Sequence, residues 1–285
     1  MNPEPHLRRA IPKGILRLVL LAASILAPLH IVRAQTVVMS FNVRTSAASD
    51  GRNGWTYRRE SVKKMLEAAK PDLLGVQEAL ADQLADLAEY LPDCDRAGVG
   101  RDDGAAGGET MAIFWNRYRF RLLSCGTFWL SETPDTPSRG WDAACNRTVT
   151  WARLEDLLSG RTVCFFNTHL DHKGSKARAN SVELILKRIA ETASSSDAVF
   201  LTGDMNSEPD SRIIRRLAEN LRDARTWSPV TDEDNSFNGF GRGAESTLDY
   251  IFYLNATPFA FRTVTDRFDA RYVSDHYPVA ALMAY

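Results

Sequence analysis

Cysteine and histidine are scarce in this chain, and their scarcity excludes several kinds of site. No Cys-x-x-Cys pair occurs among the four cysteines, so neither a zinc knuckle nor a thioredoxin-like centre is expected; they are Cys94, Cys125, Cys145 and Cys164. There is no His-Glu-x-x-His and no Gly-x-Ser-x-Gly segment, which argues against zinc protease and α/β-hydrolase sites. Only His169, His172 and His276 lie beyond residue 34, which is too few for a histidine-rich binuclear zinc site.

Residues 1–34 differ in character from the rest of the chain. Basic residues stand before or within an apolar run over 15–29, and Val32 and Ala34 are small residues where a signal peptidase reads the chain. We therefore expect 1–34 to be a signal peptide cleaved before Gln35, and the remaining chain to be secreted or periplasmic. The alternative is a retained anchor. The run is short for a spanning helix and a proline interrupts its end, so no stable membrane insertion is expected after cleavage.

The remaining chain is acidic overall and has no sign of division into domains. Cleavage removes five of the 35 basic and one of the 36 acidic residues, which leaves a formal charge of −5. This balance is untypical of a nucleic-acid scavenger, although a bound cation would change the local sign. No repeat or low-complexity linker occurs over 35–285, so we expect one domain and a monomer. An oxidising compartment would permit a disulfide, but the sequence does not choose among three partners for Cys125.

Hydrophobic periodicity predicts many short strands and a few amphipathic helices. We expect helices at 57–70, 80–91, 177–192 and 210–218, the first two ended by prolines. We expect strands at 36–43, 72–77, 110–115, 119–130, 147–154, 161–168, 198–202, 248–253, 259–265 and 278–283. This mixture predicts the α+β class, with helices packed outside sheets.

Polar side chains of particular kinds recur where these apolar strands begin or end. They are Asn42, Glu78, His169, Asp171, Asp204, Asn206, Asp249, Asp275 and His276. Such strands can converge at one rim of a sheet pair. Mg²⁺ prefers oxygen ligands and keeps several waters, so one or two carboxylates and an amide suffice to hold it. We therefore expect a metal-assisted phosphate-ester site.

The chemistry of phosphate-ester hydrolysis assigns a role to each side chain. Asp204 can hold the attacking water and Asn206 can orient it or a phosphate oxygen. His169 and His276 can donate to non-bridging oxygens, and Asp249 can fix the tautomer of His276. The alternatives are structural: a satisfied core histidine for His276, and turn residues for Asn42 and Asp204.

Six segments in order resemble the endonuclease/exonuclease/phosphatase family, which is deoxyribonuclease I-like. They are 39–44 (MSFNVR), 76–78 (VQE), 168–171 (THLD), 203–209 (GDMNSEP), 248–252 (LDYIF) and 274–279 (SDHYPV). The resemblance implies a four-layer αββα sandwich of two mainly antiparallel sheets flanked by helices. It implies metal binding at Glu78, with Asn42 and Asp275 nearby. It also implies hydrolytic roles for His169, Asp204, Asn206, Asp249 and His276, leaving open the base and the number of metals.

Segments 128–134 and 140–142, together with Arg147, are similar to a bacterial branch of this family whose members are mostly uncharacterised. Arg147 and Arg178 are candidate phosphate or substrate contacts, because a guanidinium matches phosphate oxygens; a structural ion pair is the alternative. Asp171 is a candidate substrate contact or a support for its own loop.

The sequence thus predicts an exported Mg²⁺-dependent phosphoesterase, with Mn²⁺ as an alternative metal. A phosphodiesterase or nuclease-like hydrolase is the first expectation. The alternatives are a sugar-phosphate or phospholipid-headgroup phosphoesterase, or a non-catalytic binding protein with the same fold. The absence of a long hydrophobic hairpin makes the lipid substrate the weaker expectation.

Overall fold

The computed structural model describes residues 35–285. The predicted signal peptide lies outside the described residues and stays a prediction. Within 35–285, no helix is long and apolar enough to cross a membrane.

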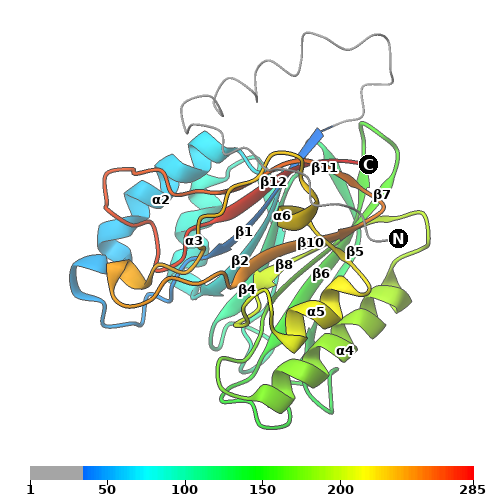
Figure 1. Cartoon of the computed structure of the whole chain (residues 1–285), viewed down its shortest axis with the longest axis horizontal. Helices are drawn as coiled ribbons and strands as arrows, with labels where there is room; N and C mark the ends of the chain where they lie inside the picture. Colours follow the sequence, from blue (N-terminus) through cyan, green and yellow to red (C-terminus); the bar gives the residue numbers. More distant parts are fainter. Residues whose placement is uncertain (1–34) are drawn as a thin grey trace. The chain divides into compact units, whose positions relative to one another are not determined.

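Two six-stranded sheets form the centre of the domain (Figure 1). The first contains, in spatial order, β11 (Thr257–Thr263), β12 (Val279–Ala284), β1 (Gln35–Asn42), β2 (Leu73–Ala79), β4 (Thr110–Asn116) and β3 (Cys94–Ala97). The second contains β5 (Phe120–Trp129), β6 (Thr148–Asp156), β7 (Thr162–His169), β8 (Ala198–Asp204), β10 (Asp249–Leu254) and β9 (Arg222–Asp223). Each sheet has one parallel pair, β1–β2 and β7–β8, and its other pairs are antiparallel.

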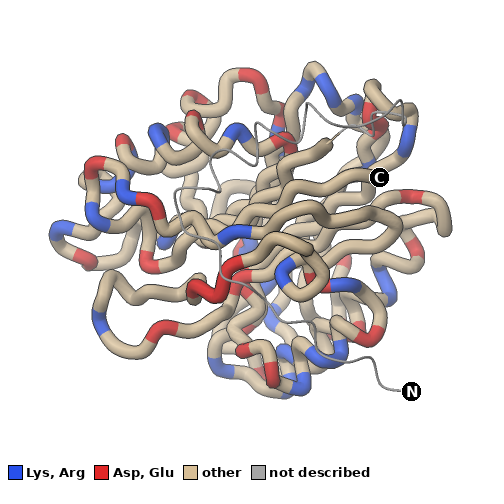
Figure 2. Tube along the Cα trace, turned by 45° about the horizontal axis from the view of Figure 1, so that its top comes forward, with Lys and Arg blue, Asp and Glu red and all other residues tan. Residues whose placement is uncertain are grey.

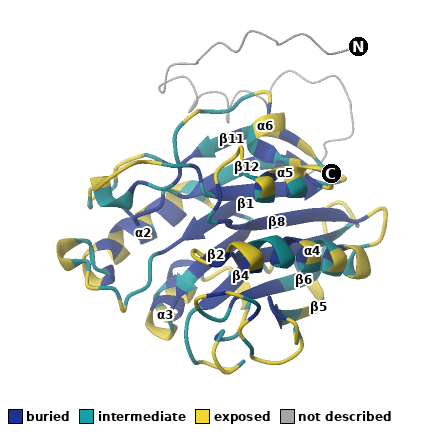
Figure 3. Cartoon of the chain, turned by 60° about the horizontal axis from the view of Figure 1, so that its bottom comes forward, coloured by how far each residue is buried: buried dark blue, intermediate teal, exposed yellow. Residues whose placement is uncertain are grey.

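Helices cover the outer faces of both sheets (Figure 1). The helices beside the first sheet are α2 (Trp55–Ala69) and α3 (Ala81–Tyr90); those beside the second are α4 (Ser175–Thr192) and α5 (Arg212–Ala218). Short turns of helix are η1 (Gly51–Asn53), α6 (Ala224–Trp227) and η2 (Gly239–Gly241). Each long helix buries one stripe and exposes the other, as Figure 3 shows for α2 and α4.

Three hydrophobic clusters account for the four layers. One lies between the sheets and includes Val38, Phe165 and Phe200. A second joins α2 and α3 to the first sheet, and a third joins α4 and α5 to the second sheet. In α4, Val182, Ile185 and Ile189 recur at helical spacing and supply the buried stripe. The predicted α+β sandwich is therefore confirmed.

Strand register brings the polar strand ends to one rim. In the parallel pairs, Asn42 lies opposite Gln77 and His169 lies opposite Asp204. Strand β10 runs antiparallel to β8, so its first residue, Asp249, also lies opposite Asp204. Strand pairing thus makes neighbours of residues that are 35 to 45 positions apart in sequence.

Three of the shortest elements were not predicted from the sequence. Strands β3 and β9 and helix α6 were not expected; each has four residues or fewer, which is too short for a hydrophobic period to emerge. Helix α2 begins at Trp55 rather than at 57, because the indole of Trp55 packs in the hydrophobic cluster that joins α2 and α3 to the first sheet. All four cysteines are free thiols.

A buried ion-pair network closes the end of the sandwich where β1 begins. Arg119 donates to the Gln35 carbonyl oxygen (2.6 Å) and the Thr36 hydroxyl (2.6 Å), and pairs with Asp156 (3.3 Å) and Asp72 (3.2 Å). The hydroxyl of the last residue, Tyr285, donates to Asp156 (3.0 Å). The network therefore ties the first and last strands to the second sheet.

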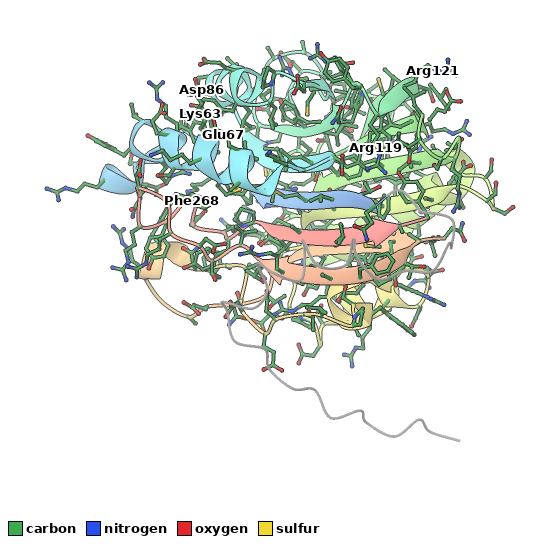
Figure 4. All side chains as sticks on the ribbon, turned by 90° about the horizontal axis from the view of Figure 1, so that it is seen from above. Lys63, Glu67, Asp86, Arg119, Arg121 and Phe268 are labelled. Carbon is green, nitrogen blue, oxygen red and sulfur yellow. The ribbon has the colours of Figure 1, made fainter. Side chains whose placement is uncertain are left out.

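We predict that Arg119→Ala lowers the free energy of unfolding by about 3–5 kcal/mol, because it removes the cation that pairs with the fully buried carboxylate of Asp156. The measurement is urea unfolding followed by circular dichroism. The matched control is Arg121→Ala, since Arg121 lies close by (Figure 4) but its side chain is 65% exposed. It should cost no more than about 1 kcal/mol, and equal losses in the two variants would contradict the prediction.

Candidate active site

The carboxylate of Asp204 lies at the centre of the rim. Asp204 ends β8, is 2% exposed, and accepts a hydrogen bond from the Asn42 amide (3.1 Å). Nε2 of His169 lies 3.4 Å and Nε2 of His276 lies 3.7 Å from Oδ2 of Asp204. The backbone N–H of Asn206 donates to the other oxygen (2.9 Å). One carboxylate thus joins residues from both sheets.

Asp249 orients His276 from the side opposite Asp204. Nδ1 of His276 lies 2.7 Å from Oδ2 of Asp249, and both residues are buried. The Ser236 hydroxyl accepts hydrogen bonds from the backbone N–H groups of Leu248 and Asp249 (3.0 Å each). The ring of Phe237 packs edge-on against the imidazole, with centroids 5.0 Å apart. The imidazole therefore has a fixed orientation, with Nε2 directed toward Asp204.

The two histidines at the rim have opposite protonation preferences. Burial lowers the pKa of His276, but the charges of Asp249 and Asp204 outweigh it and raise the pKa to about 10. Burial lowers the pKa of His169 well below 6.5, and the positive charge of Arg147 lowers it further. His276 is therefore a cation near neutral pH, whereas His169 is a neutral imidazole.

Burial raises the pKa of Asp204 to about 7, while the positive charge of His276 opposes the rise. A carboxylate with a pKa near neutrality is a suitable general base, because it is ionised yet accepts a proton readily.

Asn206 and His169 form the second arm of the site. The amide of Asn206 donates to Nε2 of His169 (2.9 Å) and to the Leu170 carbonyl oxygen (2.9 Å). A neutral His169 then carries its proton on Nδ1, which is buried and has no hydrogen-bond partner among residues 35–285. Asn206 has φ of 44°, in the left-handed region that asparagine tolerates better than most residues.

Asn42 connects Asp204 to a second group of carboxylates. Its amide also donates to Oε1 of Glu78 (3.0 Å), and the other oxygen of Glu78 accepts from the Thr45 N–H (3.0 Å). Asp275 lies in the loop before β12, where Oδ2 is 3.5 Å from Nε of Arg44. Glu78 and Asp204, which are on different sheets, are therefore bridged by one side chain.

The rim suits a divalent cation. Four carboxylates gather there, Glu78, Asp204, Asp249 and Asp275, together with the amide of Asn42. Ligand atoms of Asp204, Asp249 and His276 lie within 4.8 Å of one another. Oδ1 of Asp249 is buried without a hydrogen-bond partner among the described residues. Burial also raises the pKa of Asp275, while the positive charges of His276 and Arg44 oppose the rise. Hard oxygen donors in negative excess fit Mg²⁺ or Mn²⁺.

The three predicted substrate contacts lie together beside His169. Arg147, which is 4% exposed, pairs with Asp171 (3.2 Å) and lies 3.0 Å from Nδ1 of His172. Its Nη1 has no partner among residues 35–285. Arg178 donates to the Asp171 carbonyl oxygen (2.7 Å). Arg147 and Arg178 thus have structural partners, and their contact with substrate stays a prediction.

Asp171 supports its own loop. Its carboxylate accepts hydrogen bonds from the backbone N–H groups of Lys173 (3.0 Å), Gly174 (2.7 Å) and Ala144 (3.1 Å). Burial opposes ionisation of Asp171, but these donors and Arg147 lower its pKa overall. This is the loop-support alternative that the sequence left open, and a direct substrate contact by Asp171 stays a prediction.

Three residues of the rim were missed at the sequence level. Arg44 forms a two-pronged contact with Asp50 (2.9 and 3.2 Å) and approaches Asp275. It lies two residues after Asn42, inside segment 39–44, so the sequence contained a signal for it. Ser236 and Phe237 contact the Asp249–His276 pair from a loop without periodicity, and no sequence signal marked them.

Residues 39–276 match the model of the Endonuclease/Exonuclease/phosphatase family. The chain belongs to this family. Its members are phosphoesterase hydrolases, so the predicted resemblance and reaction class are confirmed at that level.

Solved structures of other family members are close to this one. A mannosyl-6-phosphatase from Bacteroides thetaiotaomicron is 33% identical, with a TM-score of 0.84 over 88% of this chain and 100% of its own. A family protein from Bacteroides vulgatus is 32% identical, with a TM-score of 0.84 over 88% and 99%. In sequence, the chain is also similar to an uncharacterised protein of Acanthamoeba polyphaga mimivirus, with 25% identity over 80% of this chain and 91% of that protein.

We predict that, in the metal-free protein, the imidazole of His276 titrates well above 6.5 and that of His169 titrates below it. Asp249→Asn should lower the pKa of His276, because it removes the largest favourable charge. NMR titration of the histidine ring protons measures both values, with His172→Gln assisting assignment. An unchanged His276 midpoint in Asp249→Asn would contradict this account.

Proposed function

We propose that this chain is an exported, Mg²⁺-dependent phosphoesterase that cleaves a phosphate ester with an activated water molecule. The observation that carries the proposal is that His169 and His276 meet at the buried carboxylate of Asp204. The amide of Asn42 connects this carboxylate to Glu78. Such a constellation supplies a base, a cation and hydrogen-bond donors within reach of one phosphoryl group. Export and a monomeric state remain part of the proposal.

Each residue of the rim has a defined task in this proposal. Asp204 accepts the proton of the attacking water, since its pKa of about 7 matches neutral conditions. The cationic His276 donates from Nε2 to a non-bridging oxygen, where negative charge accumulates. Asn206 holds the neighbouring His169 ring in place. Asp249 holds His276 in orientation throughout.

Glu78, Asn42 and Asp275 would hold the divalent cation. A cation there supplies Lewis-acid charge that stabilises the phosphoryl oxygens and lowers the pKa of a bound water.

We further propose that the substrate is a phosphorylated sugar. The named relative with 33% identity is a mannosyl-6-phosphatase, which supports this choice. Surface charge also supports it, because Figure 2 shows acidic and basic residues interspersed over the visible loops and helices. A nucleic-acid substrate would favour a concentrated basic surface.

A cavity beside β5 is large enough for a neutral ring. It measures about 280 Å³, and its lining contains no charged residue: Ala97, Gly98, Val99, Gly104, Cys125, Gly126, Thr127 and Trp129. Trp129 pairs with Thr148 in β6, and Val149 pairs with Thr168 in β7, so this one lining residue lies two strands from the end of β7. That separation is roughly 10 Å, from the usual spacing between strands. The other lining residues of β5, Cys125 to Thr127, pair with Thr150 to Ala152 and lie farther from the rim.

We predict that hexose 6-phosphates are hydrolysed faster than DNA or bis-p-nitrophenyl phosphate, in the presence of Mg²⁺ or Mn²⁺. Asp204→Ala should lower kcat by at least about 10²-fold on the best substrate, as for other positioned bases. The control is Asp135→Ala, whose side chain is 82% exposed. Faster cleavage of DNA would support the nuclease expectation instead. Binding without turnover of any ester would identify a non-catalytic binding protein.

We predict that Glu78→Gln weakens Mn²⁺ binding by at least about tenfold, because it removes the negative charge from an oxygen donor. Isothermal titration of the purified protein with MnCl₂ measures the dissociation constant, and Glu183→Gln on the exposed face of α4 is the control. Equal affinities in wild type and Glu78→Gln would place the cation elsewhere.

A further inference from the structure

Helix α2 carries a buried arginine beneath the active-site rim. Arg58 is 1% exposed and is among the largest fully buried side chains of residues 35–285. Its neighbours in the helix, Arg59 and Glu60, are exposed. Burying a charged side chain costs free energy unless its N–H donors have hydrogen-bond acceptors. The acceptors of the Arg58 guanidinium therefore indicate its structural role.

The guanidinium donates to three backbone segments at once. Its Nε donates to the Asn53 carbonyl oxygen (2.6 Å), its Nη1 to that of Val273, and its Nη2 to that of Arg44 (3.3 Å). The ring of Trp55 lies 5.5 Å and the ring of Phe240 lies 5.7 Å from Cζ. One planar group therefore links η1, η2 and the segments that follow β1 and precede β12.

Two of these three segments carry active-site residues. Arg44 is two positions after Asn42, and its N–H donates to Oδ1 of Asn42 (3.0 Å), which leaves the Asn42 amide directed at Glu78 and Asp204. Val273 is followed directly by Ser274, Asp275 and His276. The two segments are more than 220 residues apart in sequence, and Arg58 holds the backbone of both.

No carboxylate among the described residues forms an ion pair with Arg58; Asp275 and Asp50 act on it only at longer range. Arg119, the other buried arginine discussed above, pairs directly with two carboxylates. A guanidinium bound to carbonyl oxygens alone is a poor source of stability, because burial of its charge is not offset by an opposite charge. Its planar array of donors is well suited to fixing the geometry of several loops.

We propose that Arg58 is a positioning residue that sets the Asn42–Arg44 segment and the Asp275–His276 segment in register across the rim. This inference rests on the proposed phosphoesterase function only for its kinetic consequence. Loss of Arg58 would let the two segments shift relative to Asp204, and a displacement of about 1 Å is enough to lower turnover by about 10²-fold.

The test compares Arg58→Ala and Arg58→Lys with Arg119→Ala. Figure 4 shows Arg119 and Phe268 at opposite ends of the sandwich. Phe268 belongs to the segment between β11 and β12 that also contains Val273. Both alanine variants should unfold at lower temperature than wild type. Only Arg58→Ala should lose kcat, by about 10²-fold, and guanidinium chloride at non-denaturing concentration should restore part of it. Arg58→Lys should be intermediate, since an ammonium cannot span three carbonyl groups.

A second measurement does not depend on activity. Hydrogen–deuterium exchange should become faster in Arg58→Ala within segments 43–54 and 270–278, and should be unchanged there in Arg119→Ala. If wild type proves inactive on every ester, this exchange pattern still decides the role of Arg58. The proposal is overturned if Arg58→Ala keeps wild-type kcat, if guanidinium restores nothing, if exchange rises equally across the chain, or if neither Arg58 variant folds.

Discussion

The organisation of this protein depends on the burial of one carboxylate, that of Asp204, between two imidazoles and an amide. Asn42 reaches it from the first sheet, His169 from the adjacent parallel strand, and His276 from the loop before the last strand. Because Asp204 is 2% exposed, its charge must be balanced by these partners or by a bound cation. The two sheets must therefore meet at this rim with fixed register, and the hydrophobic layer between them provides that register.

Buried charges have different partners at the two ends of the sandwich. At the end where β1 begins, Arg119 neutralises Asp156 and Asp72, and Tyr285 completes the network. At the rim, four carboxylates face few cations, and Arg58 is bonded to carbonyl oxygens instead of to them. The first arrangement favours stability. The second keeps acidic groups available for a cation and a phosphate, at the expense of local stability.

Sequence pattern predicted most of the framework because long apolar strands and helices have a clear period. It did not predict β3, β9 or α6, which are too short, nor the exact start of α2, where Trp55 extends the helix by packing. In the site, the strand-end residues named from the sequence lie at the same rim, and their catalytic and metal-binding roles stay predictions. Asp171 shows a limit of such prediction: its loop-supporting hydrogen bonds involve backbone groups, whose positions no motif specifies.

The sequence alone determined the family, the sandwich class and the identity of the polar residues. It could do so because each motif is a short segment in which a polar, functional side chain stands at the end of an apolar strand. Only the tertiary structure decided which of them touch. Asp204 contacts Asn42 across 162 positions of sequence, and Arg58 contacts Val273 across 215. The protonation states of His169 and His276 were likewise decided by the fold, because burial and neighbouring charges shift a pKa and both arise from residues distant in the chain.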